Sequence, residues 1–140
     1  MHLKAHAFPI VRMDFDQDSP GGLDESLATF EALLARRQEF VLIGRGANRQ
    51  EQDHEERKTL AIWMKRHRDS LRSYVLALVY VAPEADDRLA AEAGAATYEK
   101  FWGYPMLVTA NDAEGLAMAG CLLAGESISV ATRTHQQADR

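Results

Sequence analysis

The sequence has a single cysteine, no surplus of basic residues and no long hydrophobic run. Cys121 has no partner for an intrachain disulfide, and the first residues lack the apolar core of a secretory signal, so we expect a reducing, cytoplasmic setting. The net charge of −5 argues against nucleic-acid binding, because that class usually carries excess Lys and Arg. The longest nearly apolar run, residues 74–83, is far shorter than the roughly 20 residues that span a membrane. We therefore expect neither a nucleic-acid partner nor a membrane span.

The length and composition fit one domain with one sizeable core. The chain has 140 residues, of which 46% are hydrophobic, as is ordinary for a soluble globular protein. We expect a single α/β domain over residues 1–125 and a tail over residues 126–140, in which residues 127–130 form a short edge strand. No fixed-period repeat occurs, which excludes a solenoid.

Five segments of the expected domain have the pattern of β-strands. Residues 10–15 alternate apolar and polar side chains, as in a strand with one covered face, and residues 3–8 add an edge strand. A strand is expected at residues 39–43, and its uninterrupted apolar stretch, residues 40–43, predicts a central position with both faces covered. Two further strands are expected at residues 74–81 and 106–109.

Helical patterns separate and follow these strands. They are expected at residues 23–37, 53–72, 84–98 and 111–124. Asp53 and Asn111 each stand three residues before a Glu, which is the capping-box pattern of a helix start. The alternation of strands and helices predicts a mostly parallel or mixed sheet of four to five strands, with about four helices and right-handed crossovers.

The order of these elements, together with residues 40–43, 60–68, 78–81 and 101–105, resembles the STAS superfamily, and most closely its SpoIIAA-like bacterial branch. That branch contains small single-domain proteins related to anti-sigma factor antagonists. The resemblance covers roughly Phe8 to Leu123. It implies a regulatory or binding module without catalysis, and some relatives in the superfamily carry lipids.

The regulatory branch carries a phosphorylatable Ser or Thr at the start of the helix after the second central strand. The matching stretch here is residues 45–49, where Ala47 and Asn48 have no hydroxyl. A phosphate at a helix N-terminus would be stabilised by the helix dipole and would alter a docking surface. The resemblance therefore implies a docking surface without its usual phosphorylation switch.

The same loop is a candidate anion site. Glycines allow backbone N–H groups to approach a phosphate or carboxylate, and guanidinium groups bind such anions bidentately. The candidate residues are Arg45, Gly46, Asn48 and Arg49. The simpler interpretation is a glycine-containing turn with solvent-exposed arginines.

His67 lies within the apolar stripe of the expected 53–72 helix, where an imidazole could serve as a base or a metal ligand. The simpler interpretation is a half-buried histidine that is hydrogen-bonded to the backbone. No second His, Cys or carboxylate stands at a ligand spacing on that helix face, and the other histidines are scattered. We therefore expect no metal and no cofactor.

A group of aromatic residues could line an apolar pocket, for which the small residues of the 84–98 helix would leave room. The candidate pocket residues are Trp63, His67, Tyr98, Phe101 and Trp102. The alternative is that the aromatic side chains fill the core and the alanines permit close packing. An exposed Phe101 and Trp102 pair would instead mark a dimer or partner surface.

The sequence contains no evident nucleophile–base or metal constellation, so we expect a non-catalytic binding or protein-interaction module. Its partner would be another protein or a second copy of this chain, bound through residues 127–130 or through the 84–98 helix. The first alternative is a small-molecule or lipid carrier with an apolar pocket. The second is an enzyme that uses His67 together with carboxylates brought near it by the fold.

Overall fold

The computed structural model describes residues 2–15, 21–46 and 54–125. This part of the chain forms one five-stranded sheet with the strand order β1-β2-β3-β4-β5. β1 pairs antiparallel with β2, and the other neighbouring strands pair in parallel. The expected α/β class and mixed sheet are therefore confirmed. The strands are β1 (His2–Lys4), β2 (Ile10–Asp14), β3 (Phe40–Arg45), β4 (Val75–Val81) and β5 (Met106–Thr109).

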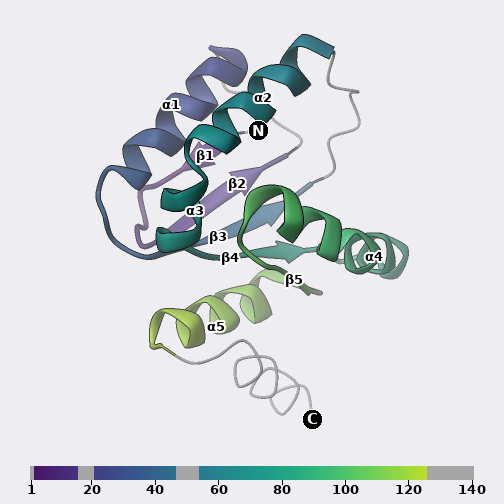
Figure 1. Ribbon diagram of the computed structural model, residues 1–140. Helices are drawn as coiled ribbons and strands as arrows, with labels where there is room; N and C mark the ends of the chain where they lie inside the picture. The colour runs from purple at the N-terminus through teal and green to yellow at the C-terminus, as the bar shows by residue number, and fades with distance from the viewer. Residues whose placement is uncertain (1, 16–20, 47–53, 126–140) are drawn as a thin grey trace.

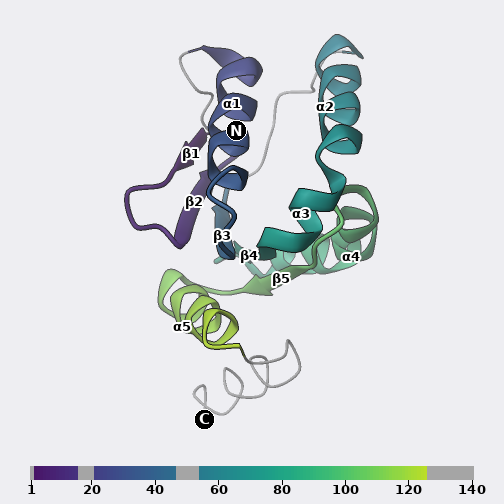
Figure 2. The ribbon, with the colours of Figure 1, turned by 60° about the vertical axis from the view of Figure 1, so that its left-hand side comes forward.

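Five helices accompany the sheet within the described residues, one more than the sequence predicts. They are α1 (Gly22–Leu34), α2 (His54–Arg66), α3 (Arg68–Tyr74), α4 (Ala85–Trp102) and α5 (Asp112–Leu123). α1, α2 and α3 lie above one face of the sheet, and α5 lies below the other (Figure 1). Figure 2 shows from a second direction that α5 lies on the opposite side of the sheet from α1, α2 and α3. None of the described helices is long and apolar enough to cross a membrane.

The helix expected over residues 53–72 is divided at His67, and this corrects the prediction of one continuous helix. His67 has φ −106° and ψ 12°, which is not a helical conformation, and α3 begins at the next residue. The apolar spacing from Leu60 to Leu71 continues through this one-residue break. A pattern of apolar residues therefore cannot reveal it.

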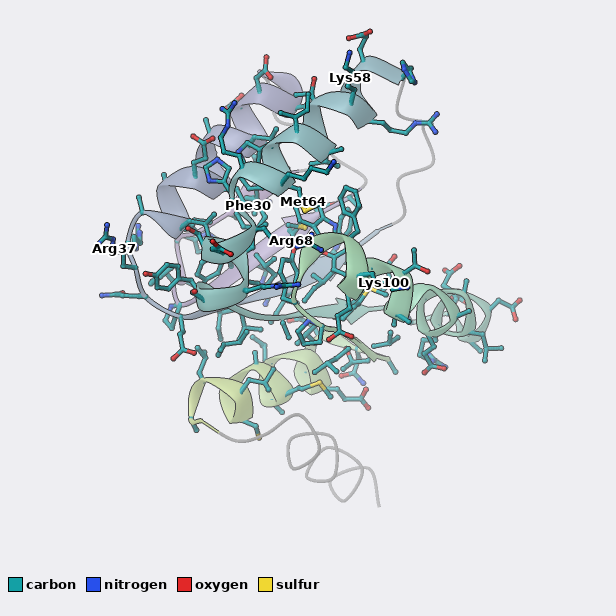
Figure 3. The ribbon with its side chains drawn as sticks, in the orientation of Figure 1. Phe30, Arg37, Lys58, Met64, Arg68 and Lys100 are labelled. Carbon is teal, nitrogen blue, oxygen red and sulfur yellow. The ribbon has the colours of Figure 1, made fainter. Side chains whose placement is uncertain are left out.

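The sheet has a different core on each face. Alternate residues of β3 point to opposite faces, so Phe40 and Leu42 join one core while Val41 and Ile43 join the other. The first core is rich in aromatic residues and lies against α1, α2, α3 and the end of α4. Figure 3 shows Phe30 and Met64 turned toward the sheet in this layer, while Lys58 points away. The second core is aliphatic and is covered by α5.

Two helix ends follow directly from local sequence. Asn111 Oδ1 accepts from the Glu114 N–H at 2.9 Å, so the N-cap predicted at Asn111 is confirmed; the Glu114 carboxylate returns to the N–H of Ala110, one residue before the N-cap, at 2.9 Å. Gly103 adopts φ +89° at the end of α4, a conformation that favours glycine. The capping box predicted at Asp53 and the strand predicted at residues 127–130 lie outside the described residues.

Candidate functional site

A pocket of about 370 Å³ lies between the sheet and α4. The sheet contributes Leu78 and Tyr80 from β4 and Met106 from β5, and α4 covers them as the crossover between these two strands. Leu78 and Tyr80 point to the same face, because side chains alternate along a strand. In parallel α/β sheets, ligands commonly bind in crevices near the carboxyl ends of the strands. This pocket extends toward that edge.

The wall on the α4 side is formed largely by small residues. Ala90 and Ala91 line the pocket in the N-terminal half of the helix, and Tyr98 lines it further along. Phe15, after β2, and Gly46, after β3, complete the lining at the carboxyl edge of the sheet. Methyl side chains on the helix leave space over β4 that longer side chains would fill. The alanine-rich pattern of α4 is therefore the local cause of the cavity.

The polar groups around the pocket are hydroxyls and one carboxylate. The Tyr80 hydroxyl donates to the Gly46 carbonyl oxygen at 2.6 Å. The hydroxyls of Tyr98 and Tyr104 lie 3.0 Å apart, and burial raises the pKa of both phenols above their ordinary value. Both are therefore neutral at physiological pH. Asp87, in the first turn of α4, supplies the carboxylate.

The five predicted pocket residues do come together, but mainly as a packed core. Trp63 and Trp102 are each 7% exposed, and their ring centroids lie 6.4 Å apart. The His67 ring packs on the Trp63 ring with a centroid distance of 4.6 Å, and the Phe101 ring packs edge-on against the Trp102 ring with a centroid distance of 5.5 Å. Tyr98 alone of the five lines the 370 Å³ pocket. The cavity is thus displaced from the two tryptophans toward the alanines of α4.

His67 binds a carboxylate rather than the backbone partner that the simpler interpretation predicts for its side chain. Its Nε2 lies 3.1 Å from Glu31 Oε1, and the same oxygen accepts from the Trp63 indole N–H at 2.8 Å. Glu31 belongs to α1, so this contact ties α1 to α2. The sequence gives no sign of it, since Glu31 and His67 are 36 positions apart.

One requirement of the catalytic alternative is met by this pair, because a carboxylate lies within hydrogen-bond reach of His67. Glu31 is shared, however, with the Trp63 indole, which fixes it as a structural link between helices. Across the described residues, no group of three or more His, Cys, Asp or Glu is gathered closely enough to hold a metal ion.

Two residues of the predicted anion site, Arg45 and Gly46, line different pockets. Gly46 lines the apolar pocket, whereas Arg45 lines a separate polar cleft of about 200 Å³ on the α5 face. Asn48 and Arg49 lie outside the described residues. Arg45 continues the alternation of β3, which sends it to the same face as Val41 and Ile43. Arg45 and Gly46 therefore line two different pockets, and the anion site that includes Asn48 and Arg49 stays a prediction.

An ion pair that the sequence does not indicate borders the polar cleft. Arg12 of β2 contacts both carboxylate oxygens of Asp112, the first residue of α5, with Nη2 at 3.1 Å from Oδ2. The hydrogen bond from Arg12 lowers the pKa of Asp112 below its ordinary value, and the charge of Arg45 adds to this effect. The two partners are 100 positions apart in the chain. The pair links α5 to β2.

Comparisons with protein-family models, with curated proteins and with solved structures found no match. Only the geometry and chemistry of the described residues therefore bear on function. Among them, the pocket beside α4 is the feature that most resembles a binding site.

Proposed function

We propose that this chain is a non-catalytic binding module whose pocket beside α4 takes a small, largely apolar molecule. The observation that carries the proposal is the pocket of about 370 Å³ between the sheet and the alanines of α4. Ligand pockets commonly measure about 300 to 1,000 Å³ and are lined by apolar and aromatic side chains with a few polar groups. The volume and the lining both fit that description.

The chemistry of the lining supports binding rather than reaction. The Tyr80 hydroxyl donates a hydrogen bond to the Gly46 carbonyl oxygen, and burial raises the pKa of Tyr98, which keeps this phenol protonated. A general base or nucleophile needs an ionisable group held against a partner that activates it. The Tyr80 hydroxyl donates to a carbonyl oxygen and the Tyr98 hydroxyl lies against that of Tyr104, and the carboxylate that lines the described part of the pocket stands in the first turn of α4.

The proposal includes a STAS-like identity of the SpoIIAA-like kind. It is supported by the order of strands and helices and by the central strand β3, which is buried on both faces as far as Gly44. The chain has Ala47 and Asn48 where the regulatory branch has a phosphorylatable residue. A bound small molecule would then take the place of phosphorylation as the signal that the module responds to.

Native mass spectrometry of freshly purified protein tests the proposal. We expect a non-covalent adduct of a few hundred daltons that disappears when the protein is denatured and refolded, because unfolding separates the strands and the helix that line the pocket. The refolded protein should then bind an added apolar probe in one-to-one stoichiometry. Absence of both the adduct and probe binding would contradict the proposed function.

A second candidate function is self-association through α4. Leu89 is 65% exposed, the largest exposed fraction among the large apolar side chains of the described residues. A second copy of this chain that packs α4 against α4 would cover it. Sedimentation velocity at several concentrations should show a dimer that Leu89→Ser weakens; a monomer at every concentration would contradict this candidate.

A further inference from the structure

The carboxyl-edge end of the pocket combines an acidic group with two aromatic rings. Asp87, Phe15 and Tyr80 all line this cavity. We propose that the ligand is an organic cation, in which an ammonium group sits near these three residues and an apolar body extends along the sheet. This inference rests on the proposed binding function and adds the chemical class of the ligand.

Among the described residues, Asp87 is the one charged residue that lines the pocket. In the part of the chain that the structure describes, no cationic side chain forms an ion pair with it. Its neighbour Arg88 is turned elsewhere, because its Nη1 donates to the carbonyl oxygens of Ala82 at 2.9 Å and Pro83 at 2.7 Å. The carboxylate is therefore available to a cationic ligand and repels an anionic one.

Two aromatic rings stand at the same cavity. The ring centroids of Phe15 and Tyr80 lie 6.1 Å apart at an interplanar angle of 47°. Both residues are partly exposed. The Phe15 N–H donates to the Arg45 carbonyl oxygen at 2.9 Å, which holds the Phe15 backbone in place, and the Tyr80 hydroxyl donates to the Gly46 carbonyl oxygen, which holds the Tyr80 ring itself. The negative face of an aromatic ring attracts cations, and a fixed ring loses little entropy on binding.

The remaining lining suits the apolar body of such a ligand. Leu78 and Met106 are cross-strand neighbours on β4 and β5, and Ala91 faces them from α4. These side chains offer no charge to a second polar group. A molecule with one cationic end and one apolar end therefore matches the pocket better than a fatty acid or a dication does.

Three probes with the same eight-carbon chain test the inference: octyltrimethylammonium, octanol and octanoate, titrated calorimetrically at low ionic strength. We expect the cation to bind about tenfold more tightly than octanol, from cation–π and carboxylate attraction together. Octanoate should bind more weakly than octanol. The preference for the cation should shrink in high salt, because Asp87 is exposed and its field is screened.

The chain offers a matched control for the carboxylate. Asp86 lies in the same first turn of α4 as Asp87 but does not line the pocket. Asp87→Asn should reduce the advantage of the cation over octanol severalfold and leave the part that the two rings supply, whereas Asp86→Asn should preserve the full advantage and the order of the three probes. The two variants remove the same charge from the same helix end, so any difference in their affinity for the cation comes from the position of Asp87 in the pocket.

The outcomes separate this inference from the proposed function. If octanol binds but the cation has no advantage, or if Asp86→Asn removes that advantage as fully as Asp87→Asn does, the assignment of a cationic ligand is overturned and the pocket remains a binding site. If none of the three probes binds, the proposed function fails along with it.

Discussion

The two halves of α4 meet the rest of the domain with side chains of very different size. In the C-terminal half, Tyr98 and Trp102 pack against Tyr104, and the Lys100 carbonyl oxygen accepts from Arg68 Nη2 at 3.0 Å. In the N-terminal half, Ala90 and Ala91 border the pocket. One helix thus contributes both a solid aromatic core and the wall of a cavity.

Within α4, large side chains at one end stabilise the fold, and small side chains at the other end leave room for a ligand. Aromatic residues bury large areas and dominate core energetics, so the C-terminal half should carry most of the stability that α4 provides. Alanine buries little and leaves space over β4. Tyr98 stands at the border, since it lines the pocket and also contacts Trp102 at a centroid distance of 6.0 Å.

The largest expected effect on stability comes from truncating an aromatic side chain in the C-terminal half of α4. Trp102 is 7% exposed and stacks on Phe30 at an interplanar angle of 10°. Trp102→Ala should lower the free energy of unfolding by about 3 to 5 kcal/mol, because it removes a large buried side chain and leaves a cavity. Urea denaturation measures this change. A loss below about 1 kcal/mol would mean that the aromatic half does not support the fold as described.

A smaller effect on stability is expected at Gly44 of β3, which lies against two residues of the pocket. A Cβ atom at Gly44 would lie 2.8 Å from Leu78 Cδ1 and 3.0 Å from Phe15 Cε2. Gly44→Ala should therefore destabilise the protein by about 1 to 3 kcal/mol through overpacking. Leu78 and Phe15 both line the pocket, so the same variant should weaken probe binding. Unchanged stability together with unchanged binding would contradict this close packing.

The glycine within α4 should respond with the opposite sign. Nothing lies within 4 Å of a Cβ atom built at Gly94, which sits inside the helix. Gly94→Ala should raise the free energy of unfolding by about 0.5 to 1 kcal/mol, because alanine favours the helical backbone. Urea denaturation of Gly94→Ala, Gly44→Ala and wild type measures the free energy of unfolding of each protein and compares the two variants. Destabilisation by Gly94→Ala would show that this side of α4 is covered.

The smallest effect is expected on the opposite face of the sheet. Asp112 is 54% exposed, so its ion pair with Arg12 should contribute about 0.5 kcal/mol at neutral pH. Because the folded-state pKa of Asp112 lies below its ordinary value of 3.8, this contribution is present above pH 3.8 and is lost as the pH falls through the folded-state pKa.

The measurement is the stability difference between wild type and Asp112→Asn across the acidic range. This difference should vanish at the lowest pH, and probe binding at neutral pH should be the same in both proteins, since Asp112 is on α5 rather than beside the pocket. A difference that grew as the pH fell would contradict the assigned direction of the pKa shift.

The sequence predicts what depends on neighbouring residues. The N-cap at Asn111 and the apolar run of β3 are local signals, and both appear in the structure. The alternation that places Arg45 on the α5 face was also available in the sequence, since it continues the pattern of Val41 and Ile43.

The sequence could not predict contacts between distant positions. Glu31 meets His67 and Arg12 meets Asp112 only because the sheet and helices bring them together. The pocket arises in the same way, since its lining combines residues from Phe15 to Met106. The alanines of α4 indicated room for a cavity, but its position depends on how β4 and β5 lie beneath them.

The most direct test of the central claim is a titration with a fluorescent apolar probe into two matched variants. Ala91 lines the pocket and Ala93 is exposed, and both lie on α4. Ala91→Leu adds three carbons to the cavity wall and should abolish probe binding while the protein stays folded, whereas Ala93→Leu should bind like wild type. Equal binding by the two variants would contradict the proposal that the pocket beside α4 is the binding site.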